Sequence, residues 1–120
     1  MAISYKNRGI AKNRLGQYQK ALLDFNEAYR LNSKDVSILL ELAFARYRAQ
    51  EYNLAIEVAT EAIAIKPNSA RAYYIRAWVY YERSDNPAKA SADFEKAYSL
   101  GIPRDDKPLS SVENRGPVPL

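Results

Sequence analysis

Apolar and polar residues follow one another along this chain with the spacing of amphipathic helices, and short polar breaks divide it into segments. The pattern predicts six helices, over residues 4–15, 18–31, 36–49, 52–65, 70–83 and 88–100. The breaks at Gly16-Gln17 and Gln50-Glu51 are so short that the helices on either side must return antiparallel. The sequence therefore predicts an all-α chain of three antiparallel helix pairs.

Residues with known preferences for helix ends support these boundaries. Ser4 and Asp35 are suited to cap the starts of the first and third helices. Gly16 and Gly101 are suited to the left-handed conformation that ends a helix. Asn86-Pro87 has the form of a capping residue followed by proline at the first helical position.

Small residues recur along the chain at a nearly constant distance. Two helices approach closely only where side chains are small, so these positions are expected in the core. Self-similarity at this period indicates stacked helix-turn-helix units. The spacing is 34 residues for Gly9, Ala43 and Ala77, and 34 then 35 for Ala28, Ala62 and Ala97.

These residues and their aromatic neighbours resemble the tetratricopeptide repeat (TPR) family. The first set is Tyr5, Gly9, Gly16, Tyr18, Ala21, Phe25 and Ala28; the second is Ala43, Tyr52, Ala55, Ala59, Ala62 and Pro67; the third is Tyr73, Ala77, Ala90, Phe94 and Ala97. The chain departs from the family at Arg8, Ser33 and an insertion near Asn86-Pro87. The resemblance implies a right-handed superhelix, an α-solenoid, with a concave ligand-binding face.

The resemblance divides the chain into a repeat domain over residues 2–102 and a tail over 103–120. The repeats are expected at about 2–35, 36–69 and 70–102. The tail contains four prolines without a sustained helical period, so it is expected to be extended or disordered. Three alternatives remain for the exposed end of the last pair: the tail folds back on it, the chain continues as a longer array, or the protein self-associates.

The composition limits the chemistry. The chain has no cysteine and no histidine, which removes the thiolate ligand and the commonest general base. We expect no enzymatic activity, no cofactor and no metal site. No run of about 18 apolar residues is present, so no membrane span is expected. A cytoplasmic location is expected if the chain is full length, and the location stays open if it is an excised domain.

The net charge of +4 is concentrated in the first repeat, where residues 2–35 carry seven bases and three acids. This surplus fits either a solvated helix face or the steering of an acidic partner. A nucleic-acid role is not expected, because the bases are not joined to a recognised binding motif.

Two charged positions change together between repeats. Arg8 and Asp24 occupy the same places as Arg76 and Asp93, whereas the middle repeat has Leu42 and Val58 there. Positions that change from charged to apolar together are expected to touch. The sequence therefore predicts an Arg–Asp ion pair in repeats one and three.

The resemblance also implies a test for one known ligand, the acidic C-terminal motif of chaperones, which the family holds in a carboxylate clamp. Lys6 matches the first clamp lysine, and Arg71 replaces a later one. Ile10, Glu41 and Ile75 stand where Asn, Asn and Arg are expected. Glu41 would repel a terminal carboxylate, so binding of that motif is not expected.

The first helix of each pair is expected to line the concave face. Ile10, Phe44 and Trp78 are spaced by 34 residues and should form one exposed row, which would mark a binding surface. A core position under tight curvature, or cover by the tail, is the alternative for this row. The expected peptide-binding residues are Lys6, Ile10, Leu40, Phe44, Tyr47, Arg48, Arg71, Tyr74, Trp78 and Tyr81.

The sequence therefore predicts a non-catalytic protein-interaction module that takes an apolar and acidic peptide segment into this groove. The alternative is an assembly element that self-associates through its last helix pair. The partner is expected to be another protein or peptide, and the chain a monomer or a weak homo-oligomer. The identity of the partner does not follow from the sequence.

Overall fold

The computed structural model describes residues 1–83 and 86–104, and in this part the chain folds into helices without a strand. The helices are α1 (Ala2–Arg14), α2 (Tyr18–Leu31), α3 (Val36–Arg48), α4 (Tyr52–Ile65), α5 (Ala70–Arg83) and α6 (Pro87–Ser99). Consecutive helices pack against each other, and α1 and α5 both contact α3. None of these helices combines the length and apolar character that crossing a bilayer requires.

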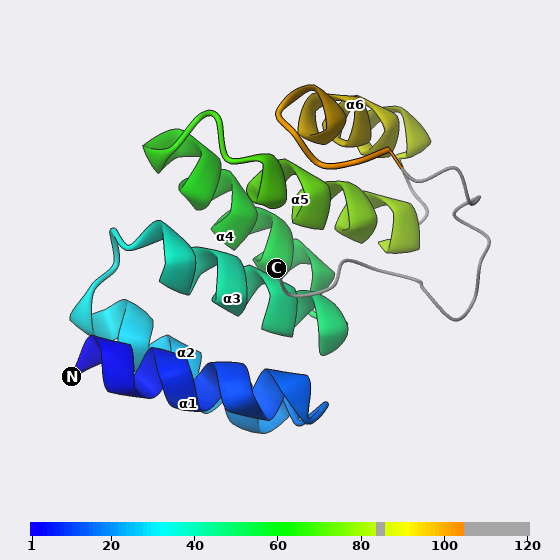
Figure 1. Cartoon of the computed structure of the whole chain (residues 1–120). Helices are drawn as coiled ribbons and strands as arrows, with labels where there is room; N and C mark the ends of the chain where they lie inside the picture. Colours follow the sequence, from blue (N-terminus) through cyan, green and yellow to red (C-terminus); the bar gives the residue numbers. More distant parts are fainter. Residues whose placement is uncertain (84–85, 105–120) are drawn as a thin grey trace.

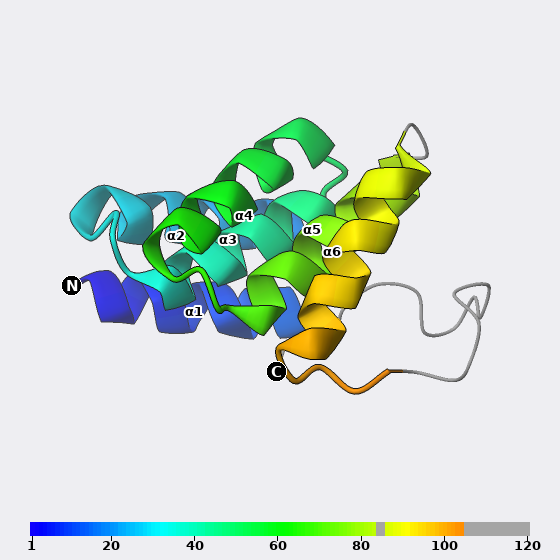
Figure 2. The ribbon, with the colours of Figure 1, turned by 90° about the horizontal axis from the view of Figure 1, so that it is seen from above.

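The three pairs lie one after another, so the molecule is a short α-solenoid (Figure 1). In Figure 1, α1, α3 and α5 form a front layer, with α2 and α4 behind it. Figure 2 shows the same succession from above, from the N-terminal pair to α6. The all-α architecture of paired helices is confirmed.

Most of the predicted helix ends are found. The side chains of Asp35 and Asn86 accept hydrogen bonds from the backbone amides of Ser37 and Lys89, at 2.9 and 3.1 Å. The expectation for Ser4 was wrong. The helix starts at Ala2, because the carbonyl of Met1 accepts hydrogen bonds from the amides three and four residues later, at Ser4 and Tyr5.

The turns that join the two helices of the first pair and of the second pair have the same backbone conformation. Gly16 and Gln50 have φ values of +76° and +66°, and each follows the C-cap residue of its helix. Hydrogen bonds from Gln17 to Lys12 and from Glu51 to Arg46 close the two turns. Gln50 therefore holds a left-handed conformation that costs a residue with a side chain about 1 kcal/mol.

Small residues bring the helices of a pair together as predicted. A Cβ atom on Gly9 would lie 2.6 Å from Cε1 of Phe25, so α1 and α2 approach as closely as a glycine permits. Ala43 and Ala77, at the equivalent places, are fully buried. The buried residues are unevenly shared, since α3 contributes nine and α1 only two.

Both predicted ion pairs are present. Arg8 donates to the two carboxylate oxygens of Asp24 at 2.7 and 2.9 Å, and Arg76 does the same to Asp93. Leu42 is buried in the core of the middle repeat, as is Val58 on the facing helix. The charged arrangement thus joins the two helices of the outer pairs.

The chain after α6 turns back over that helix. Gly101 has φ +121°, and the amide of Ile102 donates to the carbonyl of Ala97. The guanidinium of Arg104 then lies 4.5 Å from the ring centre of Tyr98 and bonds Glu95 through both nitrogens, at 2.7 and 2.9 Å. The extended tail was expected over residues 103–120, and residues 105–120 of it lie outside the described part of the chain.

Candidate functional site

The face formed by α1, α3 and α5 carries the residues that the repeat spacing aligned. The exposed row expected there is wrong: the exposed fractions of Phe44 and Trp78 are 4% and 3%, and Ile10 is half-buried. Neighbouring rings cover these side chains. The aromatic residues therefore form the floor of the face, and polar groups form its rim.

Trp78 lies at the centre of one aromatic cluster. Its ring meets those of Tyr81 and Phe94 edge-on, with centres 5.6 and 5.4 Å apart, and that of Tyr74 at 6.4 Å. Such edge-to-face contacts are favourable for aromatic pairs. The buried indole nitrogen of Trp78 has no hydrogen-bond partner in the part of the chain that the structure describes. Phe94 also stacks on Tyr98, which links this cluster to the end of α6.

A second cluster surrounds Phe44. Its ring centre lies 6.3 Å from those of Tyr18 and Tyr47, and Tyr47 in turn lies 6.4 Å from Tyr52. Arg48 is exposed, and its guanidinium lies 5.3 Å from the ring centre of Tyr18. This cluster holds one cation over aromatic rings at the rim of the face.

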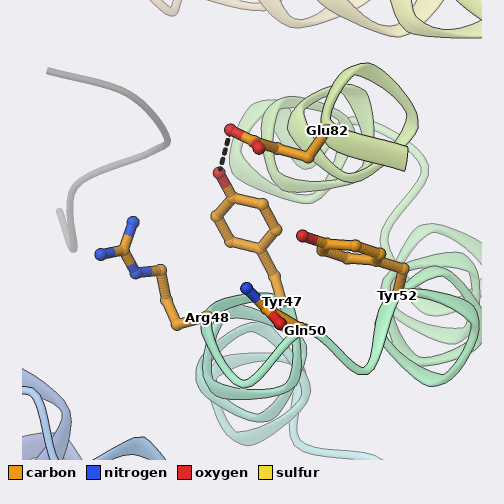
Figure 3. Close-up of a pocket in the computed structure, with 5 residues that line it drawn as sticks. All are labelled: Tyr47, Arg48, Gln50, Tyr52 and Glu82. Atoms are coloured by element: carbon orange, nitrogen blue, oxygen red, sulfur yellow. Dashed lines mark hydrogen bonds between the residues drawn. The ribbon is translucent and has the colours of Figure 1, made fainter. Parts of the chain in front are cut away.

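Between α3 and α5 lies a pocket of about 210 Å³, lined by Tyr47, Arg48, Gln50, Tyr52 and Glu82 (Figure 3). Figure 3 shows the ring of Tyr47 pointing from α3 towards Glu82 on α5, between Arg48 on one side and Tyr52 on the other. The hydroxyl of Tyr47 donates to Glu82 at 3.5 Å, a long bond. Burial, and then the charge of Glu82, raises the pKa of Tyr47.

This pocket offers a ligand both charges and neutral polar groups. Arg48 can hold a carboxylate, Glu82 can accept from a donor, and the amide of Gln50 can do either. Gln50, Tyr52 and Glu82 were not among the binding residues predicted from the sequence. The repeat spacing contained a signal for Tyr52, which lies 34 residues after the aromatic residue Tyr18 that underlies Arg48.

Arg71 and Glu41 form a buried ion pair across α3 and α5. Nη1 of Arg71 lies 3.2 Å from Oε2 of Glu41, and the two side chains are 16% and 9% exposed. Among the described residues, neither Oε1 of Glu41 nor Nη2 of Arg71 has a hydrogen-bond partner. Arg71 is therefore already neutralised by its own chain, a pairing that was not predicted from the sequence.

Lys6 lies at the other edge of the face. Its ammonium donates to the hydroxyl of Ser37 at 3.1 Å, and that hydroxyl donates to Asp35 at 2.7 Å. The hydrogen bond from the Ser37 hydroxyl is the main reason why the pKa of Asp35 lies below its ordinary value. Neither Lys6 nor Arg48 forms an ion pair with any acid among residues 1–83 and 86–104.

The expected site residues thus fall into three groups. Arg48 is exposed. Half-buried are Lys6, Ile10, Arg71, Tyr74 and Tyr81. Buried are Leu40, Phe44, Tyr47 and Trp78. All ten come from α1, α3 and α5, and we call the surface that they form the groove. In the described part of the chain, no three acidic side chains come together to hold a metal ion.

Solved structures share this architecture. The TPR domain of Arabidopsis OM64 is 26% identical, with a TM-score of 0.79, and the alignment covers 83% of this chain and 82% of that one. The second TPR of Spaghetti (RPAP3), bound to the HSP90 peptide SRMEEVD, is 24% identical over 82% and 91%, with a TM-score of 0.77.

The type III secretion chaperone SycD of Yersinia enterocolitica, in complex with a peptide of the translocator YopD, shares the fold at 19% identity. The alignment covers 82% of this chain and 75% of SycD, with a TM-score of 0.76. Family models described as tetratricopeptide repeat match residues 14–79 and 70–100. The first match alone spans more than half of the chain, which therefore belongs to the tetratricopeptide repeat family.

Proposed function

We propose that this protein is a non-catalytic interaction module that binds a peptide segment with apolar and acidic character in the groove. The observation that carries the proposal is the pair of cations Lys6 and Arg48, which form no ion pair within the described residues although they flank an aromatic floor. Acidic side chains of a ligand would give each of these two cations an ion-pair partner. Structures of similar fold hold the peptides SRMEEVD and a segment of YopD.

The aromatic floor and the polar rim would contribute differently to the binding of a peptide. Tyr74 and Tyr81 are half-buried, so each still offers ring surface to a ligand. Tyr, Trp and Arg dominate the free energy of many interfaces. The indole N–H of Trp78 has no acceptor among residues 1–83 and 86–104, and a ligand carbonyl that reached it would satisfy it. Apolar anchors would therefore lie over the rings and acids at the two ends.

The alternative, assembly through the α5–α6 face, has less support. On that side the ring of Tyr98 is already covered by Arg104, which is itself bonded to Glu95. Ser91 on α6 is exposed where the equivalent residue of α2, Leu22, is buried. The face is thus polar where a further helix or a second copy would need an apolar contact.

The test is a selection of short displayed peptides on the full chain. We expect enriched peptides to combine apolar residues with Asp or Glu. The double variant Lys6→Glu and Arg48→Glu should lose them, because it places acids opposite the ligand acids. The matched control is Lys20→Glu with Lys34→Glu, two exposed residues outside the groove with the same change of charge.

Substitution of the buried rings would be a weaker test. Phe44→Ala and Trp78→Ala remove buried side chains, which costs about 3–5 kcal/mol of stability. A loss of binding would then report on folding. Retention of the selected peptides by the Lys6 and Arg48 variant, or their equal loss in the control, would contradict the proposal.

A further inference from the structure

We propose that the groove has an occupant in the same chain, namely residues 105–120, which compete there with the external peptide. The inference rests on the proposed function and concerns its regulation. Those residues lie outside the described part of the chain.

The described chain ends on α6, next to the aromatic cluster that includes Trp78 of the groove. Arg104 bonds Glu95 through both nitrogens and lies over the ring of Tyr98. Tyr98 stacks on Phe94 at 6.2 Å, and Phe94 meets Trp78 at 5.4 Å. One continuous row of rings thus leads from Arg104 to the floor of the groove, so the next residues start close to the site.

The remaining segment is long enough to cross the groove. Sixteen residues follow Arg104, and an extended chain advances about 3.1 Å per residue, which gives a reach of about 50 Å. A helix of 13 or 14 residues is about 20 Å long, and neighbouring helices lie about 10 Å apart. The segment can therefore lie across α5, α3 and α1.

The sequence of the segment matches the chemistry that we assign to a ligand. Leu109, Val112 and Val118 offer apolar side chains to the rings. Asp105, Asp106 and Glu113 offer carboxylates to Lys6 and Arg48. Three prolines, Pro108, Pro117 and Pro119, restrict the backbone to extended conformations, which lowers the entropy that binding removes.

Attachment to the domain adds to the effect. A segment tethered by a short linker is present at an effective concentration in the millimolar range. An intrinsically weak contact can then occupy the groove for most of the time. An external peptide would have to displace the segment, so the apparent affinity of the full chain would be lower than that of the groove alone.

The experiment compares three full-length proteins. One is the wild type; the second carries Leu109→Ser, Val112→Ser and Val118→Ser. The control carries Ser110→Ala, Ser111→Ala and Asn114→Ala, which changes as many residues of the segment and leaves the apolar ones. The probe is a synthetic peptide of residues 105–120. Its binding is followed by the amide chemical shifts of the protein and by the fluorescence of Trp78, the single tryptophan.

We expect the peptide to bind the apolar-residue variant about tenfold or more tightly than the wild type or the control. Its shifts should lie on α1, α3 and α5. Acrylamide should quench Trp78 more strongly in that variant than in the wild type. Equal affinities, shifts confined to α2, α4 and α6, or a mass that rises with concentration would each overturn the proposal.

The same proteins separate this inference from the proposed function. If the peptides selected by display bind the wild type and the apolar-residue variant equally, the segment does not compete and only the inference fails. If they bind neither protein in the groove, the proposed function itself fails. If they bind the variant more tightly than the control, both are supported.

Discussion

Arg76 and Asp93 form the same two-bond ion pair in the third repeat that Arg8 and Asp24 form in the first. The four donor–acceptor distances lie at 2.7 and 2.9 Å in both pairs. Their surroundings differ, because the Arg76 side chain is 19% exposed and that of Arg8 is 61% exposed. Arg76 also donates to Thr60 on α4, so the Arg76–Asp93 pair joins three helices.

The protein should tolerate replacement of both Arg76 and Asp93 by apolar residues better than replacement of Asp93 alone. Asp93→Val alone leaves a largely buried guanidinium without its carboxylate and should lower the free energy of unfolding by about 2 kcal/mol. Adding Arg76→Leu recreates the apolar arrangement of Leu42 and Val58 and should recover most of that loss. Urea unfolding of both variants measures it. Equal losses in the single and double variants would contradict this.

Stability on the acid side should depend on Asp24. The hydrogen bond from Arg8 holds the pKa of this carboxyl below its ordinary value, despite the opposing effect of burial. A depressed pKa means that the stabilisation is complete above the unfolded value of about 3.9 and is lost as the pH falls through the folded value. Asp24→Asn should therefore melt below the wild type near about pH 7, with a difference that shrinks below about pH 4.

The difference in melting temperature between the wild type and Asp24→Asn, followed against pH, isolates the contribution of Asp24. Asp35, whose pKa is also lowered, titrates in both proteins and cancels. A difference that stayed constant down to the lowest pH would show that the charge of Asp24 is not the cause.

Gly9→Ala should destabilise the first pair although alanine favours a helix by about 1 kcal/mol. The new methyl would lie 2.6 Å from the ring of Phe25, and overpacking of this kind costs about 1–3 kcal/mol. Thermal unfolding should show a net loss, which Phe25→Leu in the same chain partly relieves. Asn7→Ala, at an exposed position of α1, is the matched control and should change little.

Gln50→Gly should stabilise the turn between α3 and α4. The φ of +66° strains glutamine, and glycine adopts it freely, so we expect a gain of about 0.5 kcal/mol after the cost of glycine in the unfolded chain. Gly16→Gln is the mirror experiment. Nothing lies within 4 Å of a Cβ there, so its loss would come from the backbone alone. Two changes of the same sign would refute the argument.

The wild type should not bind the free peptide SRMEEVD in a fluorescence anisotropy titration. The carboxylate of Glu41 is buried and bonds Arg71, so neither residue is available to a terminal carboxylate. Glu41→Asn should produce measurable binding, together with lower stability because Arg71 loses its partner. Glu57→Asn, exposed on α4, is the control. Binding by the wild type that Lys6→Ala abolishes would contradict the prediction.

The elements that local chemistry decides could be predicted from the sequence. Asp35, Asn86 and Gly16 act on the backbone next to them, so their effect on helix ends did not depend on the rest of the fold. The Arg8–Asp24 pair was predictable for another reason. The repeats provide three versions of one contact within a single chain, and two of these versions are charged.

Features that depend on which side chain fills which space could not be predicted. The helical period gave the direction of Trp78 but not the positions of Tyr74, Tyr81 and Phe94, whose rings cover it. The pairing of Glu41 with Arg71 joins residues 30 apart, outside the 34-residue spacing that aligns the repeats. The assignment of the groove as a peptide site stays a prediction.

The nine buried residues of α3, against two in α1, make the molecule unequal along its length. In a solenoid each repeat is held by its neighbours, so α1 should open to hydrogen exchange long before α3 does. A segment lying across α1, α3 and α5 would link α1, the helix with the fewest buried residues, to α3, the helix with the most. Occupancy would then slow exchange most in α1, far from the aromatic rings that hold the ligand, and the protein would report a bound segment through the ordering of its first helix.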